Sequence, residues 1–208
     1  MEDIAAFQRP IARLGMVNAL AQTLLKIASP GVPDIYQGQE IWDFSLVDPD
    51  NRRAVDYDLR QTMLSALRER MQGDLRALCR DLLARWEDGA PKLYVTHVAL
   101  TARRDHAEAF VRGEYLPVAA TGARAEHVVA FARRGGGSTL LAVAPRLVAT
   151  RTRERGFAIP GAEDWGDTTL SGDVAAGRWR NLLTGEEHDG VRLAEVLAEF
   201  PVGLLVKV

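Results

Sequence analysis

Residues 31–58 read GVPDIYQGQEIWDFSLVDPDNRRAVDYD, and the interpretation of the chain on either side depends on this stretch. It carries seven acidic and two basic side chains, a formal charge of −5, whereas the other 180 of the 208 residues sum to +3. Large rings are interleaved with these charges, at Tyr36, Trp42, Phe44 and Tyr57. A solvated linker rarely carries such rings, and a core element rarely carries such charge. The stretch therefore predicts a polar, ring-lined surface that faces a partner.

The overall composition is that of an ordinary globular protein, with 47% hydrophobic and 26% charged residues in 208. A net charge of −2 gives no electrostatic basis for binding nucleic acid or an anionic membrane surface. No apolar run approaches the ~18 residues of a membrane span, and the first ten residues lack the pattern of a secretory signal. We therefore expect a cytoplasmic protein that binds neither nucleic acid nor membrane.

Metal and cofactor motifs are absent from the sequence. Cys79 is the single cysteine, and it lies on an apolar helical face, which predicts a buried hydrophobe and not a reactive thiol. The four histidines are scattered, without the spacing of metal ligands. We expect no metal and no cofactor.

Upstream of the acidic stretch, the apolar residues of 11–28 recur every three to four positions, which predicts a helix. Pro10 suits the first turn of this helix, and Ser29-Pro30-Gly31 is expected to end it. Residues 32–37 favour a short strand that Gly38 closes. A helix, a strand and then a long polar loop is the local order of an α/β layer, in which ligands collect beyond the carboxyl ends of strands.

Downstream of the loop, three helices are expected. Asp58 with Gln61 resembles a capping box that opens the first helix, and Asp74 caps the second. Gly89 and Pro91 are expected to end the second helix. Residues 92–104 combine strand-favouring and helix-favouring sequence, and we favour a third helix there.

The C-terminal part has the pattern of antiparallel strands. Residues 126–133 and 138–145 flank three consecutive glycines, which predicts a β-hairpin. Turn clusters separate three further short strand candidates. These candidates are residues 168–170, 178–183 and 202–208.

The acidic stretch has two chemical interpretations. Flat rings can cover the apolar face of a pyranose while carboxylates and guanidinium groups bind its hydroxyls, and two neighbouring carboxylates could perform glycoside chemistry. Alternatively, Asp48, Asp50 and Asp56 bind Arg52 and Arg53 only to rigidify a long loop. The residue pattern alone leaves both open.

Several segments carry a resemblance to a known family. The run PGVPDIYQG at 30–38, with Glu40 and Trp42, and the run LVDPDNRR at 46–53, with VDY at 55–57, resemble the end of the catalytic barrel in maltooligosyl trehalose synthases. These enzymes belong to the α-amylase superfamily of glycoside hydrolases. Shorter matches continue through GEY at 113–115, AFAR at 130–133, WGDT at 165–168 and Phe200-Pro201, so the resemblance covers nearly the whole chain.

The resemblance implies an α+β fold in two parts. Residues 1–115 would form the mostly helical C-terminal end of a catalytic (β/α)8 barrel, including its last strand, and residues 116–208 a small antiparallel, β-sandwich-like domain. The family enzyme is an isomerase of trehalose biosynthesis and carbohydrate metabolism, a (1→4)-α-D-glucan 1-α-D-glucosylmutase. It converts the reducing-end α-1,4 bond of a maltooligosaccharide into an α,α-1,1 bond by intramolecular transglycosylation.

The resemblance also implies that the catalytic Asp, Glu and second Asp of the family lie on earlier barrel strands, so no residue of this chain is assigned as catalytic. We expect an inactive C-terminal fragment, with a free-standing maltooligosaccharide-binding or structural module as the alternative. A homodimer could cover exposed barrel edges. The residues carried over as the wall of the sugar cleft are Tyr36, Gln37, Glu40, Trp42, Asp48, Asp50, Asn51, Arg52 and Arg53.

Overall fold

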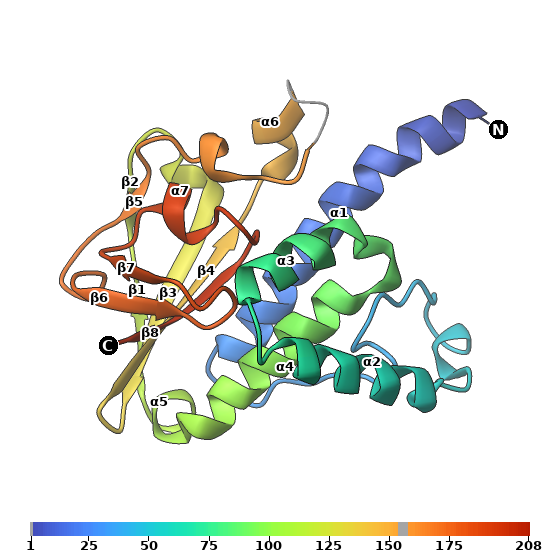
Figure 1. Ribbon diagram of the computed structural model, residues 1–208, viewed down its shortest axis with the longest axis horizontal. Helices are drawn as coiled ribbons and strands as arrows, with labels where there is room; N and C mark the ends of the chain where they lie inside the picture. Colours follow the sequence, from blue (N-terminus) through green and yellow to red (C-terminus); the bar gives the residue numbers. More distant parts are fainter. Residues whose placement is uncertain (1, 154–157) are drawn as a thin grey trace.

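The computed structural model describes residues 2–153 and 158–208, and in it a layer of helices packs beside a six-stranded antiparallel sheet (Figure 1). The helices are α1 (Glu2–Ala28), α2 (Tyr57–Arg70), α3 (Leu75–Ala84), α4 (Ala90–Asp105), α5 (Ala107–Val111), α6 (Val148–Thr152) and α7 (Leu193–Val196). The strands are β1 (Glu114–Pro117), β2 (Ala120–Thr121), β3 (Val128–Gly135), β4 (Ser138–Pro145), β5 (Thr169–Leu170), β6 (Arg178–Asn181), β7 (Glu187–Asp189) and β8 (Gly203–Lys207). The expected α+β class is confirmed.

Helix α1 is longer than the apolar periodicity indicated. It begins at Glu2, so Pro10 lies inside the helix and not in its first turn. Residues 3–9 are exposed, which explains why the buried-face pattern does not extend to them and why water can satisfy the carbonyl that Pro10 leaves without a donor. The end of the helix is as expected, with Ser29 N donating to Leu25 O at 2.9 Å and Gly31 at φ 102°.

The strand expected at residues 32–37 is not formed. Residues 32–36 are irregular, a turn follows at 37–40, and Val32 is 94% exposed. A strand is stabilised by hydrogen bonds to a neighbouring strand, and every strand pairing in the described part of the chain joins other segments. The strand propensity of residues 32–37 is therefore not enough to form a strand without a neighbouring strand to pair with.

The helices after the loop follow the expected order with three changes at their ends. One is that α3 ends at Ala84, and Gly89 instead ends the short 3-10 helix η2 (Trp86–Asp88) that follows. Asp56, and not Asp58, caps α2, because its Oδ1 accepts from Leu59 N at 2.8 Å and Asp58 lies within the first turn. Asp74 caps α3 as expected. Pro91 occupies the first turn of α4 instead of ending the previous helix, which suits a residue without an amide hydrogen. Helix α4 confirms the helix expected at 92–104.

The sheet confirms the hairpin and the short strands. Its order is β1-β3-β4-β8-β6-β7, and β2 pairs with β5 in a separate two-stranded sheet. The β3–β4 hairpin pairs Gly135 with Ser138 across Gly136 and Gly137, whose φ values of 58° and 79° are those of a tight hairpin turn. Strands β5, β6 and β8 lie within the three candidate segments at 168–170, 178–183 and 202–208.

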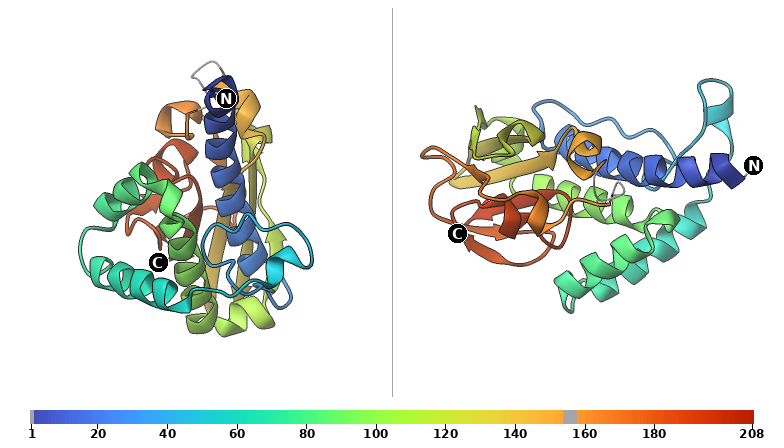
Figure 2. Two further views of the ribbon diagram at one scale, coloured as in Figure 1. Left: turned by 90° about the vertical axis from the view of Figure 1, so that its right-hand side faces the viewer. Right: turned by 90° about the horizontal axis from the view of Figure 1, so that it is seen from above.

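The middle of the six-stranded sheet is buried on both faces, while its edge strands β1 and β7 are mostly exposed. Leu140 and Phe200 join Leu20 of α1 and Tyr94 of α4 in one core. On the opposite face, Leu141 packs in a second cluster that includes Trp165, Trp179 and residues of α7. Figure 2 shows α1 running alongside the sheet. None of the described helices is long and apolar enough to cross a membrane.

Two buried hydrogen bonds join the helical layer to the β layer at Leu183. Its carbonyl oxygen accepts from Tyr94 Oη at 2.6 Å and from Cys79 Sγ at 3.4 Å. Burial raises the pKa of the Cys79 thiol to about 12. Cys79 is fully buried and uncharged at neutral pH, which confirms its expected structural character.

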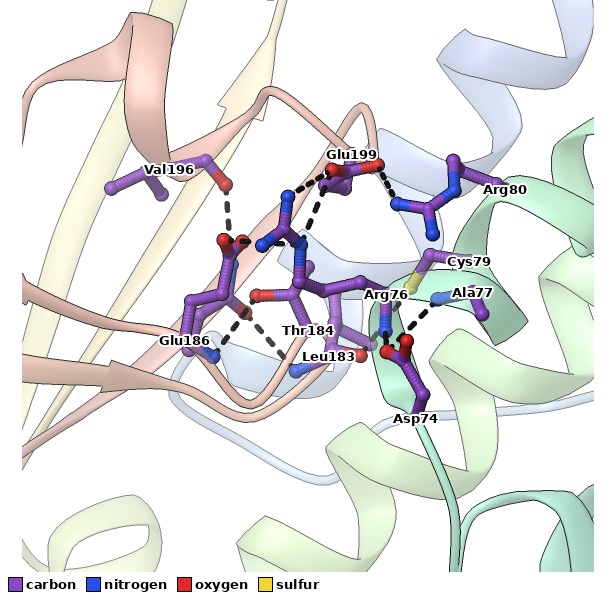
Figure 3. A network of polar contacts seen from close by, with 11 residues as sticks. Asp74, Arg76, Ala77, Cys79, Arg80, Leu183, Thr184, Glu186, Val196 and Glu199 are labelled. Carbon is purple, nitrogen blue, oxygen red and sulfur yellow. Dashed lines mark hydrogen bonds and ion pairs between the residues drawn. The ribbon is translucent and has the colours of Figure 1, made fainter.

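Glu199, in the segment before β8, makes the second link between the layers (Figure 3). Its carboxylate accepts from Arg76 Nη2 at 2.7 Å and from Arg80 Nη1 at 3.0 Å, both on α3. Arg76 also pairs with Glu186 at 3.3 Å. The hydrogen bond from Arg76, and then that from Arg80, holds the pKa of Glu199 below its ordinary value.

This link predicts an acid-sensitive contribution to stability. A carboxylate with a lowered pKa stabilises the folded state above its unfolded pKa of ~4.3, and the contribution disappears as the pH falls through its folded pKa. We expect Glu199→Gln to lower the unfolding free energy by about 1 kcal/mol at neutral pH and by much less at about pH 3. Urea titrations at both pH values measure this. Glu114→Gln, at an exposed pair with Arg134, is the control, and an equal loss for Glu199→Gln at both pH values would contradict the account.

Candidate functional site

Residues 41–42, which follow the turn at 37–40, pack against the junction between the short 3-10 helix η2 (Trp86–Asp88) and α4. Gly89 has φ 81°, and a Cβ there would lie 2.7 Å from Ile41 Cβ and 2.9 Å from Trp42 N. Trp42 Nε1 donates to Trp86 O at 2.6 Å, and Lys92 Nζ donates to Ile41 O at 3.2 Å. These contacts set the position of the Trp42 ring.

Arg60 of α2 holds the two ends of the acidic loop together. Its Nε donates to Glu40 Oε2 at 3.0 Å, its Nη2 to Gly38 O at 2.7 Å, and its Nη1 to Asp56 O at 2.9 Å. The Arg60 side chain is only 15% exposed. Because all three guanidinium nitrogens donate in one plane, a single side chain fixes both ends of the loop.

The middle of the loop is held by its own ion pairs. Asp48 pairs with Arg52 and Asp50 pairs with Arg53, while Asp50 Oδ2 accepts from Leu46 N at 2.8 Å. Both arginine side chains are largely exposed. The pairs of Asp48 and Asp50 match the interpretation in which the charges rigidify the loop. Asp56 was expected to join them but its side chain caps α2 instead.

A cavity of about 570 Å³ lies between α1, residues 42–44 and the η2–α4 junction. Its rings come from Trp42, Phe44 and Trp86. Small or flexible apolar residues of α1 line another side, namely Ala12, Gly15, Met16 and Ala19. Its polar lining consists of Gln8, Arg9, Asp43, Glu87 and Lys92. Rings with a few convergent polar groups are typical of small-molecule sites, whose volumes are ~300–1,000 Å³.

Two ionisable groups in the cavity have shifted pKa values. Burial lowers the pKa of Lys92, with a further lowering from Lys26 and an opposing effect of Asp43 and Glu40. Hydrogen bonds from the Ser45 side chain and backbone lower the pKa of Asp43. Asp43 is therefore ionised at neutral pH and acts only as a hydrogen-bond acceptor.

The structure separates the residues assigned to the sugar wall. Trp42 lines the cavity, and Glu40 lies behind it on Arg60. Tyr36 is exposed just before the turn at 37–40, and Gln37 is exposed as its first residue. Asn51 is partly buried in the short helix η1 (Asp50–Arg52). The four remaining residues form the paired loop and do not line the cavity. They are Asp48, Asp50, Arg52 and Arg53.

Sequence reasoning missed Arg60, Trp86 and Lys92 as parts of this site. Trp86 and Lys92 contact the segment 41–42 across separations of 44 and 51 residues. No local spacing signals such contacts. Only the Gly89-Ala90-Pro91 sequence, which places a sharp turn between the two residues, could have suggested that they lie together. In the described ranges no three or more His, Cys, Asp or Glu side chains are grouped to hold a metal ion.

The fold is that of an α+β protein in which a helical layer, packed on an antiparallel sheet, carries a ring-lined cavity. No protein-family model matches the chain. It is 41% identical over 191 residues to a protein of Mycobacterium tuberculosis, in strains CDC 1551 and H37Rv, assigned as a maltooligosyl trehalose synthase. The match covers 91% of this chain and 20% of that protein.

Solved structures give the same relationship. Maltooligosyltrehalose synthase from Arthrobacter ramosus is 41% identical with a TM-score of 0.73, over 93% of this chain and 22% of that one. Another maltooligosyl trehalose synthase structure is 25% identical with a TM-score of 0.66, over all of this chain and 24% of that one. The chain belongs to the maltooligosyl trehalose synthase family and corresponds to a C-terminal portion, about a fifth of the length of these relatives.

The geometry of Arg60 yields a prediction on loop stability. Arg60→Ala removes three hydrogen bonds from a largely buried guanidinium, and we expect it to lower the unfolding free energy by about 2–3 kcal/mol. Arg52→Ala removes an exposed ion pair of the same loop and should change it by less than about 1 kcal/mol. Urea denaturation measures both. Equal losses for the two variants would show that Arg60 has no special role in holding the loop.

Proposed function

We propose that this chain acts as a non-catalytic C-terminal portion of a maltooligosyl trehalose synthase. The whole enzyme would be an isomerase that moves the reducing-end α-1,4 bond of a maltooligosaccharide to an α,α-1,1 bond, producing a terminal trehalose unit. The observation that carries the proposal is the 41% identity over 191 residues. The role of this portion would be to supply one wall of the saccharide cleft.

We propose further that the chain alone does not catalyse this reaction. Retaining glycoside chemistry needs a nucleophile and an acid/base on opposite sides of the reacting bond. Glu40, Asp48 and Asp50 each form an ion pair with an arginine. An arginine partner occupies oxygens of the carboxylate that a reacting bond would need, so these acids suit a scaffold better than an acid/base role.

The segment 32–36 supports a place for this portion in a larger barrel. It forms no helix or strand in the described chain, it resembles the last barrel strand of the family, and Val32 at its start is 94% exposed. Strand formation there would require neighbouring strands that the described chain does not supply. Exposed apolar residues of α1, Ile4 and Phe7, would also be covered by such neighbours. A homodimer is the rival way to cover them.

A free-standing maltooligosaccharide-binding module is the second candidate function. The ring-lined cavity favours it, because a binding role needs no catalytic carboxylate. In both candidate functions the chain binds a maltooligosaccharide. They differ in whether the chain contributes to turnover within a larger enzyme.

The test places this chain in a complete enzyme. The matched region of the M. tuberculosis relative is replaced by the present sequence, and maltopentaose is assayed for loss of reducing ends. We expect turnover by the chimera and none by the 208-residue chain alone or by the relative without the matched region. Turnover by the chain alone would disprove the proposed inactivity. A folded but inactive chimera would reject the enzymatic role and leave the binding module.

A further inference from the structure

We propose that Tyr94 is a positioning residue: by fixing α4 against the β layer, its hydroxyl sets where Trp42 stands in the wall of the saccharide cleft. The effect on saccharide conversion rests on the proposed function, whereas the link between the layers is argued from buried hydrogen bonds. The inference gives the β layer a part in the reaction, although none of its described residues lines the ring-lined cavity.

The turn between β6 and β7 presents a fixed acceptor to the helical layer. Asn181, at the end of β6, is fully buried, and its Oδ1 accepts from Leu183 N at 3.0 Å while its Nδ2 donates to Val196 O at 3.2 Å. Its backbone N donates to Glu186 O at 2.8 Å, and its carbonyl accepts from Gly185 N at 2.7 Å. A buried network in which each polar group is paired is rigid. The Leu183 carbonyl is therefore held in one orientation.

Tyr94 connects this carbonyl to α4. Its Oη donates to Leu183 O at 2.6 Å, and its ring packs edge-on against Phe200 with the centroids 6.1 Å apart. Burial raises the pKa of the Tyr94 hydroxyl, which therefore keeps its proton and remains a donor. Apolar packing is non-directional, whereas a hydrogen bond requires a particular distance and angle. The bond therefore selects one rotation and one height of α4 against the β layer.

The place of Tyr94 on α4 makes this bond relevant to Trp42. Gly89 and Lys92 contact the backbone of residues 41–42. Tyr94 follows Gly89 by five residues, and a rise of ~1.5 Å per residue puts it only about 7.5 Å further along the helix. A rotation of α4 at Tyr94 would therefore displace both contacts and, with them, the Trp42 ring.

The other polar anchors of the helical layer do not replace Tyr94. Arg103 donates to Ile27 O at 2.8 Å, but it lies near the far end of α4 and joins this helix to α1. Cys79 also donates to Leu183 O, at the longer distance of 3.4 Å, but from α3 (Figure 3). Among the described residues, Tyr94 is the one residue of α4 whose side chain donates to the β layer.

Hydrogen exchange of the Trp42 indole, whose N–H donates to Trp86 O, tests the link in the 208-residue chain. Tyr94→Phe keeps the ring and removes only the hydroxyl, and we expect it to speed this exchange at least about threefold. Thr169→Val is the matched control, because it removes a side-chain hydrogen bond to Val191 O within the β layer. It should leave the Trp42 exchange within about 1.5-fold of native. Urea titrations check that both variants are folded.

The effect on the reaction is tested in the chimera with the M. tuberculosis relative. We expect Tyr94→Phe to raise the KM for maltopentaose by about three- to tenfold. It should change kcat by less than about twofold, because it loosens a binding wall and leaves the reacting groups in place. In a Trp42→Phe background the same substitution should have little further effect on KM, since it acts through Trp42.

Two outcomes would overturn the inference. One is equal Trp42 indole exchange in Tyr94→Phe and Thr169→Val. The other is a rise in KM that is just as large in the Trp42→Phe background, which would show that Tyr94 acts only through general stability. A chimera that folds but is inactive before any substitution at Tyr94 would reject the proposed function, and the indole exchange alone would then decide whether Tyr94 positions Trp42.

Discussion

The contact between Gly89 and the backbone of Ile41 and Trp42 is the constraint on which the site depends. The left-handed conformation at Gly89 ends η2 and opens α4, and the absence of a side chain lets the loop backbone approach to contact distance. This approach brings Trp86 O within reach of the Trp42 indole and Lys92 within reach of Ile41 O. The cavity residues come from three segments, and this contact joins two of them. The third, α1, packs against α4 in the shared core.

The rest of the fold makes that junction rigid. Helix α4 is buried along most of its length, and Tyr94 anchors it to the β layer through Leu183. Arg60 fixes the loop from the other side, at Gly38, Glu40 and Asp56. The exposed Asp48–Arg52 and Asp50–Arg53 ion pairs hold the middle of the loop. We expect them to contribute little stability, because water and salt weaken the attraction between exposed charges.

The sequence predicted those features that local physics determines. Period-3.6 patterns identified α1, α2 and α3, Asp74 identified a cap, and three glycines identified the hairpin. The strand at residues 32–37 was predicted wrongly, because a strand depends on a partner and propensity is only half of the requirement. The cap at Asp58 was wrong by two residues, since several nearby acids could each serve. Trp42 was predicted as a site residue because a ring among charges is unusual, but Arg60, Trp86 and Lys92 are brought to the site only by tertiary folding.

Backbone amide and indole chemical shifts recorded during a maltotriose titration test the central claim most directly, because they report which part of the chain meets the saccharide. The account predicts progressive shifts for Gly15, Trp42 and Lys92 and for the Trp42 indole, with little change at the buried Trp179 indole, whose N–H donates to Ala175 O in the β layer. Shifts confined to residues 48–53, or no shifts, would contradict a saccharide site at the Gly89 junction.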